Sequence, residues 1–542
     1  MRFQKEPQYL AFQNHRMDPE ATAYVDKDMD KHKATGCFVA APPGSVKIAN
    51  PILAIQQDGK WRRCDDCRFG NSLQANCEFK MASLERDIPI LTEEGDVGIT
   101  RDLEKAYYKI PLDVEAQPYC AFEWLGIFYF SMVMLFGMCQ APLYFTRICK
   151  PMAAFFGAVK IPALNYIDDW FWASRPGLVP ELCRFLQAFF ELLGWSFNDK
   201  GREGTEVKLL GFVLDLVQRR FVVPMEKRVA TLGLLREHAL TGARGQPVET
   251  LPLQQMMGRV VSMSLAVPGV KVWCRALFAQ IVRATDTAAQ SLVLKADALE
   301  ELEMLVVLLT LTDGSPFMHP VTDIDIWVDS GETGWGAHME GREAHGWFEA
   351  EWIGRSSTAR ELKGLVMALK TLSGCIRGKV VRLNMDSMCA VRNIVKGGGP
   401  VPELCRLVKE AWAVCKDLSV QLVPRWQRRS EEGMVVADRL SKVGTKWALR
   451  ADFTTRWEKS LGVGVSMPDV ADAKARVVRM LASQELGALV LPRWEGQPWW
   501  KLVLDNARIH ALGPAGTVVT PNEYGWPRWE LVLAEFVGIQ MY

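Results

Sequence analysis

The stretch LNYIDDWFWA, residues 164–173, places two adjacent carboxylates inside an apolar run. Asp168 and Asp169 stand between strand-forming residues on one side and three aromatic residues on the other. Charges in such a run are costly to bury unless another group neutralises them. A tight hairpin with both carboxylates at its tip would let them hold a divalent metal ion, which would remove the repulsion between them. The alternative is a surface turn with two solvated aspartates.

A third carboxylate lies upstream in a strand-like setting. In the segment GDVGITRDLEKAYYKIPL (95–112), we expect a short strand to end at Asp102 and a helical or turn segment to begin near Ala106. With Asp168 and Asp169, Asp102 completes the set of carboxylates that a two-metal phosphoryl-transfer site needs. In such a site one ion activates the attacking oxygen and the other stabilises the leaving group, with the ions about 4 Å apart.

Five motifs, taken in order, resemble the palm of reverse transcriptases. They are DLEKAYYKIPL (102–112), FGMCQAP (136–142), YIDDW (166–170), LGWSFNDKG (193–201) and KLLGFVLD (208–215). The resemblance implies a right-hand polymerase with fingers, palm and thumb and an antiparallel palm sheet. It also implies that Asp102, Asp168 and Asp169 bind Mg²⁺ and catalyse nucleotide addition.

A basic cluster precedes these motifs. The segment QDGKWRRCDDCRFGN (57–71) opens on a DG turn signal and contains Lys60, Arg62, Arg63 and Arg68. It resembles the fingers of reverse transcriptases, and on that resemblance Lys60 and Arg62 contact the incoming triphosphate. Cations suit that position because charge builds on the phosphoryl oxygens in the transition state. The alternative is a solvated basic loop.

The same resemblance assigns four more residues around the nucleotide. Tyr107 would lie under the sugar and exclude a 2′-hydroxyl, which favours deoxynucleotides. Gly137 and Gln140 would line the template and nucleotide pocket, and Lys200 would protonate the leaving pyrophosphate. From the residues alone, Tyr107 can also be a core tyrosine and Lys200 a lone exposed lysine.

Two features bear on the compartment. The segment CAFEWLGIFYFSMVMLFGMC (120–139) is apolar except for Glu123 and approaches the length of a transmembrane helix. Gly126 and the strand-forming residues in its middle favour a buried hairpin instead. Thirteen cysteines without a secretory signal indicate a reducing compartment. We therefore expect an intracellular protein, in the cytoplasm or nucleus, with no membrane segment.

A second group of carboxylates follows a helical stretch. From 224 to 315 apolar residues recur with helical spacing, and then DIDIWVDSGETGWGAHM (323–339) predicts two strands joined by a glycine-bearing turn. Four acids follow at strand ends or on helices: Asp329, Glu361, Asp386 and Asp438. Asp329 can also be a turn residue, Asp386 a helix cap and Asp438 a first-turn acid. Glu361 shares a helical face with apolar residues, so we expect it to point inward.

The motifs WVDSGETGWGA (327–337) and VVADRLSK (435–442) resemble the ribonuclease H of retroelements. The resemblance implies that Asp329, Glu361, Asp386 and Asp438 bind metal and that the RNA strand of an RNA/DNA hybrid is cut. Two departures stand out. The loop RWQRRSEEG (425–433) has no histidine to help product leave, and Met434 stands where asparagine is common. The helices from 224 to 318 resemble the thumb and connection of reverse transcriptases, although a plain helical bundle has the same pattern.

The tail from 447 to 542 is similar to a segment that follows ribonuclease H in retroelements of the DIRS and Ngaro type, which integrate by tyrosine recombinase. Its tryptophans Trp494, Trp499 and Trp500 either stack on bases or pack a small domain. The chain is therefore identified as resembling the reverse transcriptase and ribonuclease H of such a retrotransposon, or of a host-encoded copy.

We thus expect an α+β multidomain protein in four parts: fingers and palm (1–223), helical thumb and connection (224–318), a ribonuclease H-like mixed α/β domain (319–446), and a small C-terminal α/β region (447–542). Each site would use two Mg²⁺ ions, with Mn²⁺ as a substitute. The partners implied are an RNA template, a DNA primer, an RNA/DNA hybrid and deoxynucleoside triphosphates. Because the net charge is only +1, nucleic acid must bind through local basic patches. The alternatives are a non-catalytic nucleic-acid-binding descendant and an RNA-dependent RNA polymerase.

Overall fold

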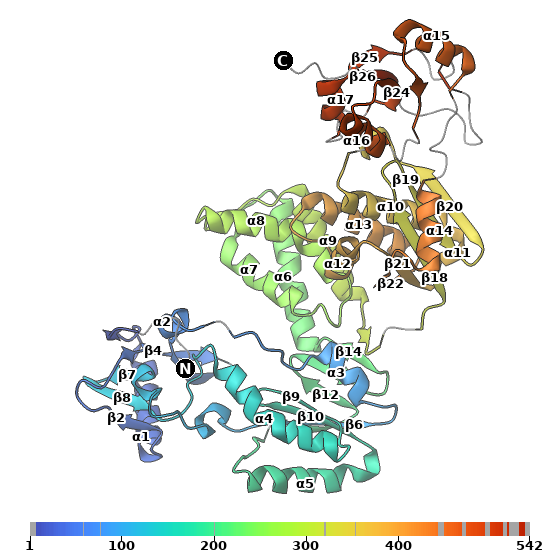
Figure 1. The fold of residues 1–542 in the computed structure, drawn as a ribbon. Helices are drawn as coiled ribbons and strands as arrows, with labels where there is room; N and C mark the ends of the chain where they lie inside the picture. Colours follow the sequence, from blue (N-terminus) through green and yellow to red (C-terminus); the bar gives the residue numbers. More distant parts are fainter. Residues whose placement is uncertain are drawn as a thin grey trace. The chain divides into compact units, whose positions relative to one another are not determined.

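In a computed structural model of the chain, the described residues are 7–536 apart from 58, 76, 200, 319–320, 353, 443–448, 469–472, 494–498, 513–517 and 520–529. The chain divides into two compact units (Figure 1). The first contains residues 1–227 and 313–318, and the second contains 228–312 and 319–542. The helical segment expected to form thumb and connection therefore falls in the same unit as the segment expected to form the nuclease.

The first unit begins with a five-stranded sheet in the order β1-β3-β7-β8-β2. Helix α1 (Pro19–Ala34) packs Val25 and Met29 into the cluster that holds Phe38 and Phe122 of this sheet. A separate hairpin is formed by β4 (Ile52–Gln57) and β5 (Lys60–Asp65). The strands of the sheet are β1 (Leu10–Ala11), β2 (Phe38–Ala40), β3 (Ile48–Ala49), β7 (Ala121–Trp124) and β8 (Ile127–Ser131).

The apolar segment 120–139 forms the hairpin β7–β8, as the sequence predicts. Its turn holds Leu125 and Gly126 at positive φ, 52° and 81°, which is a conformation that glycine adopts without strain. Within the part of the chain that the structure describes, no helix is both long enough and apolar enough to cross a membrane.

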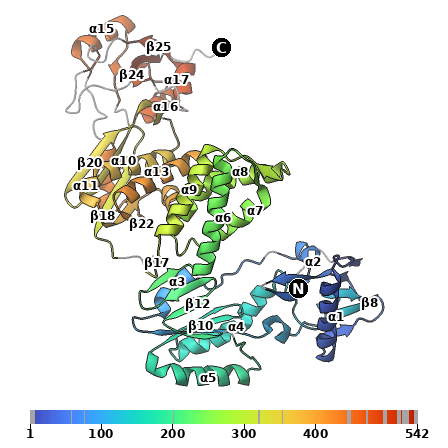
Figure 2. The same cartoon turned by 180° about the vertical axis from the view of Figure 1, so that it is seen from behind.

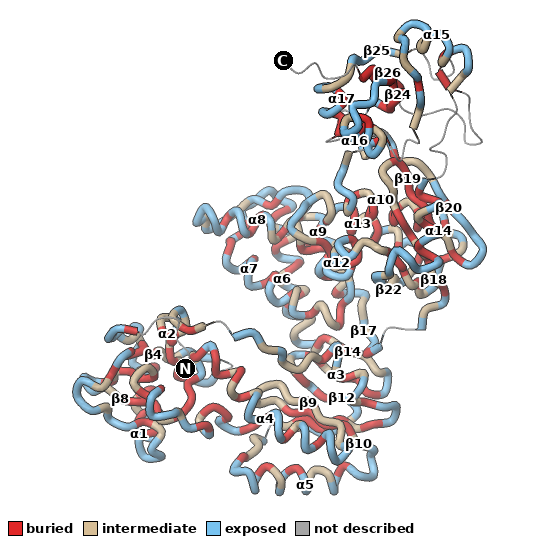
Figure 3. Tube along the Cα trace, in the orientation of Figure 1, coloured by how far each residue is buried: buried red, intermediate tan, exposed pale blue. Residues whose placement is uncertain are grey.

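The next layer is a four-stranded antiparallel sheet in the order β11-β6-β10-β9, with helices α4 and α5 packed on it (Figures 1 and 3). Phe156 of α4 and Phe190 of α5 meet the stacked indoles of Trp170 and Trp172, and all four side chains are fully buried. The elements are β6 (Val97–Asp102), β9 (Ala163–Tyr166), β10 (Asp169–Ser174), β11 (Arg202–Gly204), α4 (Ala141–Ala158) and α5 (Val179–Leu192). The aromatic run after the carboxylates therefore anchors β10 in the core.

A further four-stranded sheet closes the first unit, in the order β12-β13-β14-β17. Its strands, with the two short helices of this unit, are β12 (Glu206–Leu209), β13 (Phe212–Asp215), β14 (Arg220–Val222), β17 (Ser315–Pro316), α2 (Arg68–Ser72) and α3 (Leu84–Leu91).

The second unit opens with helices where the apolar spacing predicts them. They are α6 (Met225–Ala243), α7 (Thr250–Val261), α8 (Arg275–Asp286) and α9 (Ala296–Leu311), with a short pair β15 (Val248–Glu249) and β16 (Ser291–Leu292). Glu301 of α9 is fully buried, accepts hydrogen bonds from the backbone N–H groups of Ala276 and Leu277, and pairs with Lys409 at 2.5 Å. Because Lys409 lies on α13 (Pro402–Asp417), this buried ion pair ties the helical segment to the next one.

That next segment is a five-stranded mixed sheet in the order β20-β19-β18-β21-β22, in which β18, β21 and β22 are parallel. Helices α10 and α14 pack against β18 and β19, and α13 lies along α10 (Figure 2). The remaining elements are β18 (Ile324–Ser330), β19 (Gly334–Met339), β20 (Arg342–Trp347), β21 (Val380–Met385), β22 (Gln421–Trp426), α10 (Ser357–Thr371), α11 (Ser373–Ile376), α12 (Met388–Lys396) and α14 (Glu432–Ser441).

The C-terminal part has its own core around a four-stranded sheet in the order β23-β24-β26-β25. Trp499 and Trp500 are 2% and 3% exposed within that core, so they pack the domain and do not offer stacking faces; Trp494 lies outside the described residues. The elements are β23 (Val465–Ser466), β24 (Gly487–Pro492), β25 (Arg508–Ala511), β26 (Leu531–Phe536), α15 (Ala451–Leu461), α16 (Ala473–Ser483) and α17 (Trp500–Asn506).

Candidate metal-dependent catalytic sites

The first acidic site consists of Asp102, Asp168 and Asp169. Asp102 ends β6 and Asp169 begins β10, and the antiparallel register pairs these two residues directly. Directly paired residues project from the same face with Cβ atoms roughly 4.5–5.5 Å apart. Asp168 lies in the tight turn between β9 and β10, after Ile167 at φ 56°, and its carbonyl accepts a hydrogen bond from the Leu103 N–H at 3.0 Å. Strand pairing thus brings Asp102 opposite Asp169, which stands 67 positions later in the chain.

A polar neighbour restrains Asp102. The side-chain amide of Asn198 donates a short hydrogen bond to Oδ2 of Asp102, and the backbone N–H of Asn198 donates to the Asp102 carbonyl at 2.9 Å. Burial, and the charge of Asp102 in addition, raise the pKa of Asp168. The three carboxylates are oxygen ligands of the kind Mg²⁺ takes, but their oxygens are not gathered within 4.8 Å of one another.

Tyr107 lies beside this site and is 6% exposed. Its ring contacts Phe136 and Phe145 edge to face, with centroids 4.7 and 5.5 Å away. Burial, and then the charge of Asp168, raise the pKa of Tyr107 to about 12, so the phenol is neutral at physiological pH. Tyr107 is therefore a core residue, and the Asp168 charge contributes to its raised pKa. Lys200 lies outside the described residues.

The basic cluster divides between the two faces of a hairpin. Lys60 and Arg62 are exposed on one face of β5, whereas Arg63 and Asp65 alternate onto the buried face. The alternative of a solvated basic loop is therefore wrong for Arg63. Its side chain is 2% exposed, because successive residues of a strand point to opposite sides.

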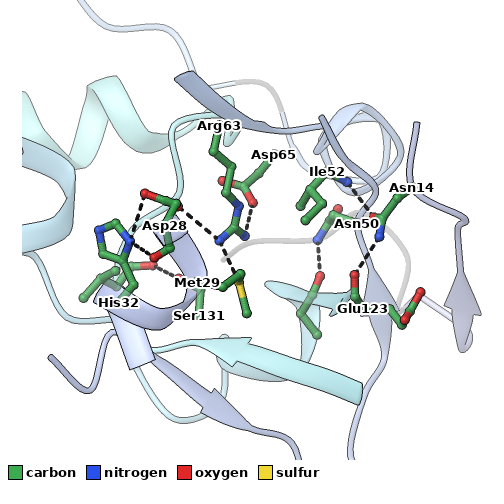
Figure 4. Close-up of polar contacts among 12 residues, drawn as sticks. Asn14, Asp28, Met29, His32, Asn50, Ile52, Arg63, Asp65, Glu123 and Ser131 are labelled. Carbon is green, nitrogen blue, oxygen red and sulfur yellow. Dashed lines mark hydrogen bonds and ion pairs between the residues drawn. The ribbon is translucent and has the colours of Figure 1, made fainter. Parts of the chain in front are cut away.

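Arg63 forms a buried charged cluster with Asp28 and Asp65 (Figure 4). Its guanidinium donates to Asp65 at 2.8 Å and lies 3.9 Å from Asp28, and it stacks over the rings of Phe38 and Phe122 at 4.3 and 4.0 Å. Removing one member of such a cluster leaves buried charge without a partner, which typically destabilises by about 3–5 kcal/mol. Arg63 therefore holds α1, β5 and the sheet together and does not face a nucleotide.

The segment FGMCQAP is tied to the α2 region by backbone contacts. The Asn71 side chain donates to the Gly137 carbonyl at 2.8 Å and accepts from the Cys139 N–H at 2.9 Å. A Cβ on Gly137 would lie 1.9 Å from the Asp65 carbonyl oxygen, so only glycine allows this approach. Gln140 is 3% exposed and donates to the Ala75 carbonyl at 3.3 Å. Gly137 therefore holds the loop against the end of β5, and Gln140 holds it against the segment after α2.

The second acidic site consists of Asp329, Glu361, Asp386 and Asp438. Asp329 lies in β18, Glu361 in α10, Asp386 just after β21, and Asp438 in α14. Asp329, Glu361 and Asp386 each offer a carboxylate oxygen within 4.8 Å of the others, and they are the one such acidic group among the described residues. This spacing can hold a divalent ion.

Burial makes this cluster electrostatically demanding. Asp329 is 1% exposed and Glu361 6%. Burial, with additions from Asp386 and Asp438, raises the pKa of Asp329 to about 6, and burial and the charge of Asp329 raise the pKa of Glu361 well above its ordinary value. Oε2 of Glu361 is buried and makes no hydrogen bond in the described structure. Since buried oxygens are nearly always satisfied, this orphaned atom fits a metal ligand.

Asp438 is held differently from the other three acids. Its carboxylate accepts from Arg429 Nη2 at 2.9 Å and from Lys442 Nζ at 2.8 Å. The Ser441 hydroxyl donates to Oδ2 of Asp329 at 2.9 Å and lies one helical turn after Asp438. The side of the cluster that faces α14 is thus covered by cations from the chain itself.

The structure also decides the alternatives for these acids. Asp329 lies inside a strand and not in a turn. The helix after Asp386 is capped by Ser387, whose hydroxyl accepts from the Ala390 N–H. Asp438 is the seventh residue of α14 (Glu432–Ser441), so it is not a first-turn acid. Glu361 points inward, as its helical face predicts.

Three residues that contact the acidic sites were not among the predicted site residues: Asn198, Ser441 and Arg429. Asn198 stands within LGWSFNDKG, and Ser441 follows Asp438 by three positions, a spacing that puts two residues on one helical face. These spacings were usable signals. Arg429 belongs to a basic run, and the sequence does not indicate which of its side chains faces the acidic site.

No family model matches the chain, and no curated protein matches it in sequence. Among solved structures it resembles foamy viral protease-reverse transcriptase in three complexes. The dRH form with double-stranded DNA has a TM-score of 0.48 and 16% identity over 78% of this chain and 74% of that one. The complex with an RNA/DNA hybrid has a TM-score of 0.49 and 16% identity over 78% of this chain and 57% of that one. The complex with double-stranded DNA has a TM-score of 0.47 and 17% identity over 79% of this chain and 88% of that one. At this identity and similarity in shape, the likeness assigns no activity to the chain.

Proposed function

We propose that the chain is an RNA- and DNA-directed DNA polymerase joined to a ribonuclease H, with one divalent-metal phosphoryl-transfer site in each unit. The observation that carries the proposal is the convergence of sequence-distant carboxylates at two separate sheets. It is sharpest at Asp329, Glu361 and Asp386, whose oxygens meet within 4.8 Å around an orphaned buried atom.

The polymerase half is supported by the pairing of Asp102 with Asp169 and by the Asp168 turn beside them. These three carboxylates would hold two Mg²⁺ ions, with Mn²⁺ as a substitute. Exposed Lys60 and Arg62 on one face of the β4–β5 hairpin are available to contact a triphosphate. Tyr107 would exclude a ribose 2′-hydroxyl, and Gly137 and Gln140 would support the pocket from the loop behind it.

The nuclease half is supported by the second acidic site. Asp329, Glu361 and Asp386 would hold a divalent ion, and Asp438 would contribute to a second. A bound ion of this kind supplies a Lewis acid for the scissile phosphate and lowers the pKa of water. Ser441 fixes the orientation of Asp329 through its hydroxyl. Hybrids are recognised mainly by shape and sugar hydroxyls, which suits a chain with a net charge of only +1.

We further propose a biological setting: a retroelement of the DIRS or Ngaro type, or a host-encoded copy of one. The sequence resemblance alone supports this step. The partners are then an RNA template, a DNA primer, deoxynucleoside triphosphates and the RNA/DNA hybrid that synthesis produces. Lys200 is proposed as the proton donor to pyrophosphate on the same resemblance.

The test is Mg²⁺-dependent primer extension on RNA and hybrid cleavage, measured on a single preparation. Asp168→Asn should abolish synthesis and spare cleavage, and Asp386→Asn should do the reverse. If the parent performs neither reaction, the chain is a non-catalytic nucleic-acid-binding protein; if both variants equal an active parent, these carboxylates do not form the catalytic sites. Equal incorporation of ribo- and deoxynucleotides would instead favour an RNA polymerase and remove the role given to Tyr107.

A further inference from the structure

The loop between β22 and α14 is anchored to the strand that carries Asp386. The Trp426 indole N–H donates to the Asp386 carbonyl at 2.9 Å, and the Gln427 N–H donates to the Met385 carbonyl at 2.9 Å. The Gln427 side chain also donates to the buried Asn384 at 3.0 Å. Three hydrogen bonds therefore fix the stem of the loop two residues before Arg429.

The fixed stem delivers Arg429 to the second acidic site. Its Nη2 donates to Asp438 at 2.9 Å, and its Nε lies 3.5 Å from Oδ2 of Asp386. One guanidinium therefore bridges two of the four carboxylates, while Asp329 and Glu361 receive no such contact from it. The Arg429 side chain is 68% exposed, so it can leave the carboxylates for solvent without disturbing the core.

We propose that Arg429 is a tethered cation that occupies the Asp438 side of the nuclease site and sets how tightly a second divalent ion binds there. This inference rests on the proposed nuclease function. An ion between Asp329, Glu361 and Asp386 meets less competition, because Arg429 contacts only Asp386 of these three, at 3.5 Å. An ion that takes Oδ1 of Asp438 as a ligand must displace the guanidinium, which holds that oxygen, while Lys442 holds Oδ2.

The displaced guanidinium can bind a phosphate group of the substrate. A scissile RNA strand brings phosphate oxygens to the cluster, and arginine binds phosphate through paired hydrogen bonds. Arg429 can thus exchange Asp438 for a phosphate when substrate and second ion arrive together. In the absence of substrate it neutralises part of the repulsion among four carboxylates, a task it shares with Lys442 on Asp438.

The test is calorimetric titration of Mn²⁺ into the full-length, substrate-free chain. All proteins carry Asp102→Asn and Asp168→Asn, so that the first acidic site contributes no ion. With Arg429 present, we expect one tight ion and one much weaker ion. Arg429→Gln should strengthen the weak ion about tenfold, because a competing charge at an exposed site is removed, and strengthen the tight ion much less, because only Asp386 among its ligands faces Arg429.

Two variants control the measurement. Arg428→Gln removes the neighbouring exposed charge and should leave both affinities as in the parent; Arg429→Lys keeps a cation in place and should hold the second ion weak. An Arg429→Gln titration that matches that of Arg428→Gln overturns the inference. A parent protein that binds two ions of equal affinity also overturns it. Failure of the proposed function is distinguishable, because then Glu361→Gln would leave the tight ion unaffected.

Discussion

The two acidic sites of the molecule differ in how closely their carboxylates are gathered and how deeply they are buried. At the second site three carboxylates are gathered within 4.8 Å, and two of them are almost fully buried. At the first site Asp102 and Asp169 face each other across two strands, each is partly exposed, and Asn198 holds Asp102 by a hydrogen bond. The carboxylates of the second site therefore repel one another strongly even without a ligand. Those of the first site are less closely gathered.

The difference teaches what each site requires to bind a metal. The repulsion among clustered buried carboxylates is relieved only by a proton or a cation, so the second site should take an ion from solution. Polymerase sites commonly bind Mg²⁺ through one or two carboxylates together with substrate phosphates. The first site should therefore fill chiefly when a nucleotide supplies the remaining oxygens.

The largest expected effect is on cleavage by Glu361→Gln. The amide keeps the size of the side chain but removes a charged ligand from the cluster, so the initial rate of hybrid cleavage should fall on the order of a thousandfold. Primer extension by the same protein, the internal control, should stay within about twofold of the parent. Normal cleavage by this variant would show that the gathered acids do not form the catalytic site.

Removing the buried charge of Arg63 should lower the stability of the first unit. Arg63→Leu leaves Asp28 and Asp65 buried without their cation and should destabilise this unit by about 3–5 kcal/mol in urea unfolding. The adjacent Arg62→Leu, on the exposed face, should change stability by less than about 0.5 kcal/mol but raise the KM for nucleotide. If both leucine variants unfold alike, the assignment of opposite faces is wrong.

The third prediction concerns pH in the presence of a chelator. The folded pKa of Asp329 is about 6 and its ordinary value is 3.8, so the folded state binds the proton more tightly. Stability from this group is therefore present below about pH 4 and is lost as the pH rises through 6, by roughly 3 kcal/mol in all. Asp329→Asn should flatten that decline in the urea midpoint of the second unit. A parent protein whose stability rises between pH 4 and 7 relative to the variant would contradict the sign.

The smallest effect is expected at Asn198. Asn198→Ala frees the Asp102 carboxylate from its amide donor, and kcat for DNA synthesis should fall about tenfold with little change in the KM for nucleotide. The neighbouring Asp199→Asn, an exposed change, serves as the matched control and should be neutral. Loss of hybrid cleavage in Asn198→Ala would indicate a general folding defect and not a positioning role.

Local patterns predict much of this fold because their causes are local. The strand ending at Asp102, the hairpin carrying Asp168 at its tip and the inward face of Glu361 follow from alternation, turn chemistry and helical spacing. Each of these features depends on the pattern of residues close by in the sequence, even where the side chain later meets distant segments. The apolar segment 120–139 is a further case, since Gly126 predicts a hairpin turn there and the structure has one.

The remaining features depend on distant segments. The burial of Arg63 requires Asp28, which lies on another element 35 positions upstream. Helix α14 begins at Glu432 and includes Gly433. A Cβ on Gly433 would lie 2.2 Å from the Trp327 ring, so this glycine serves tertiary packing and does not break the helix. No local pattern contains that information.

The most direct measurement of the contrast between the two sites is Mn²⁺ binding to the substrate-free chain, compared among the parent, Asp168→Asn and Glu361→Gln. The account predicts that the parent and Asp168→Asn bind the same tight ion and that Glu361→Gln loses it. A tight ion that disappears in Asp168→Asn and persists in Glu361→Gln would contradict the account.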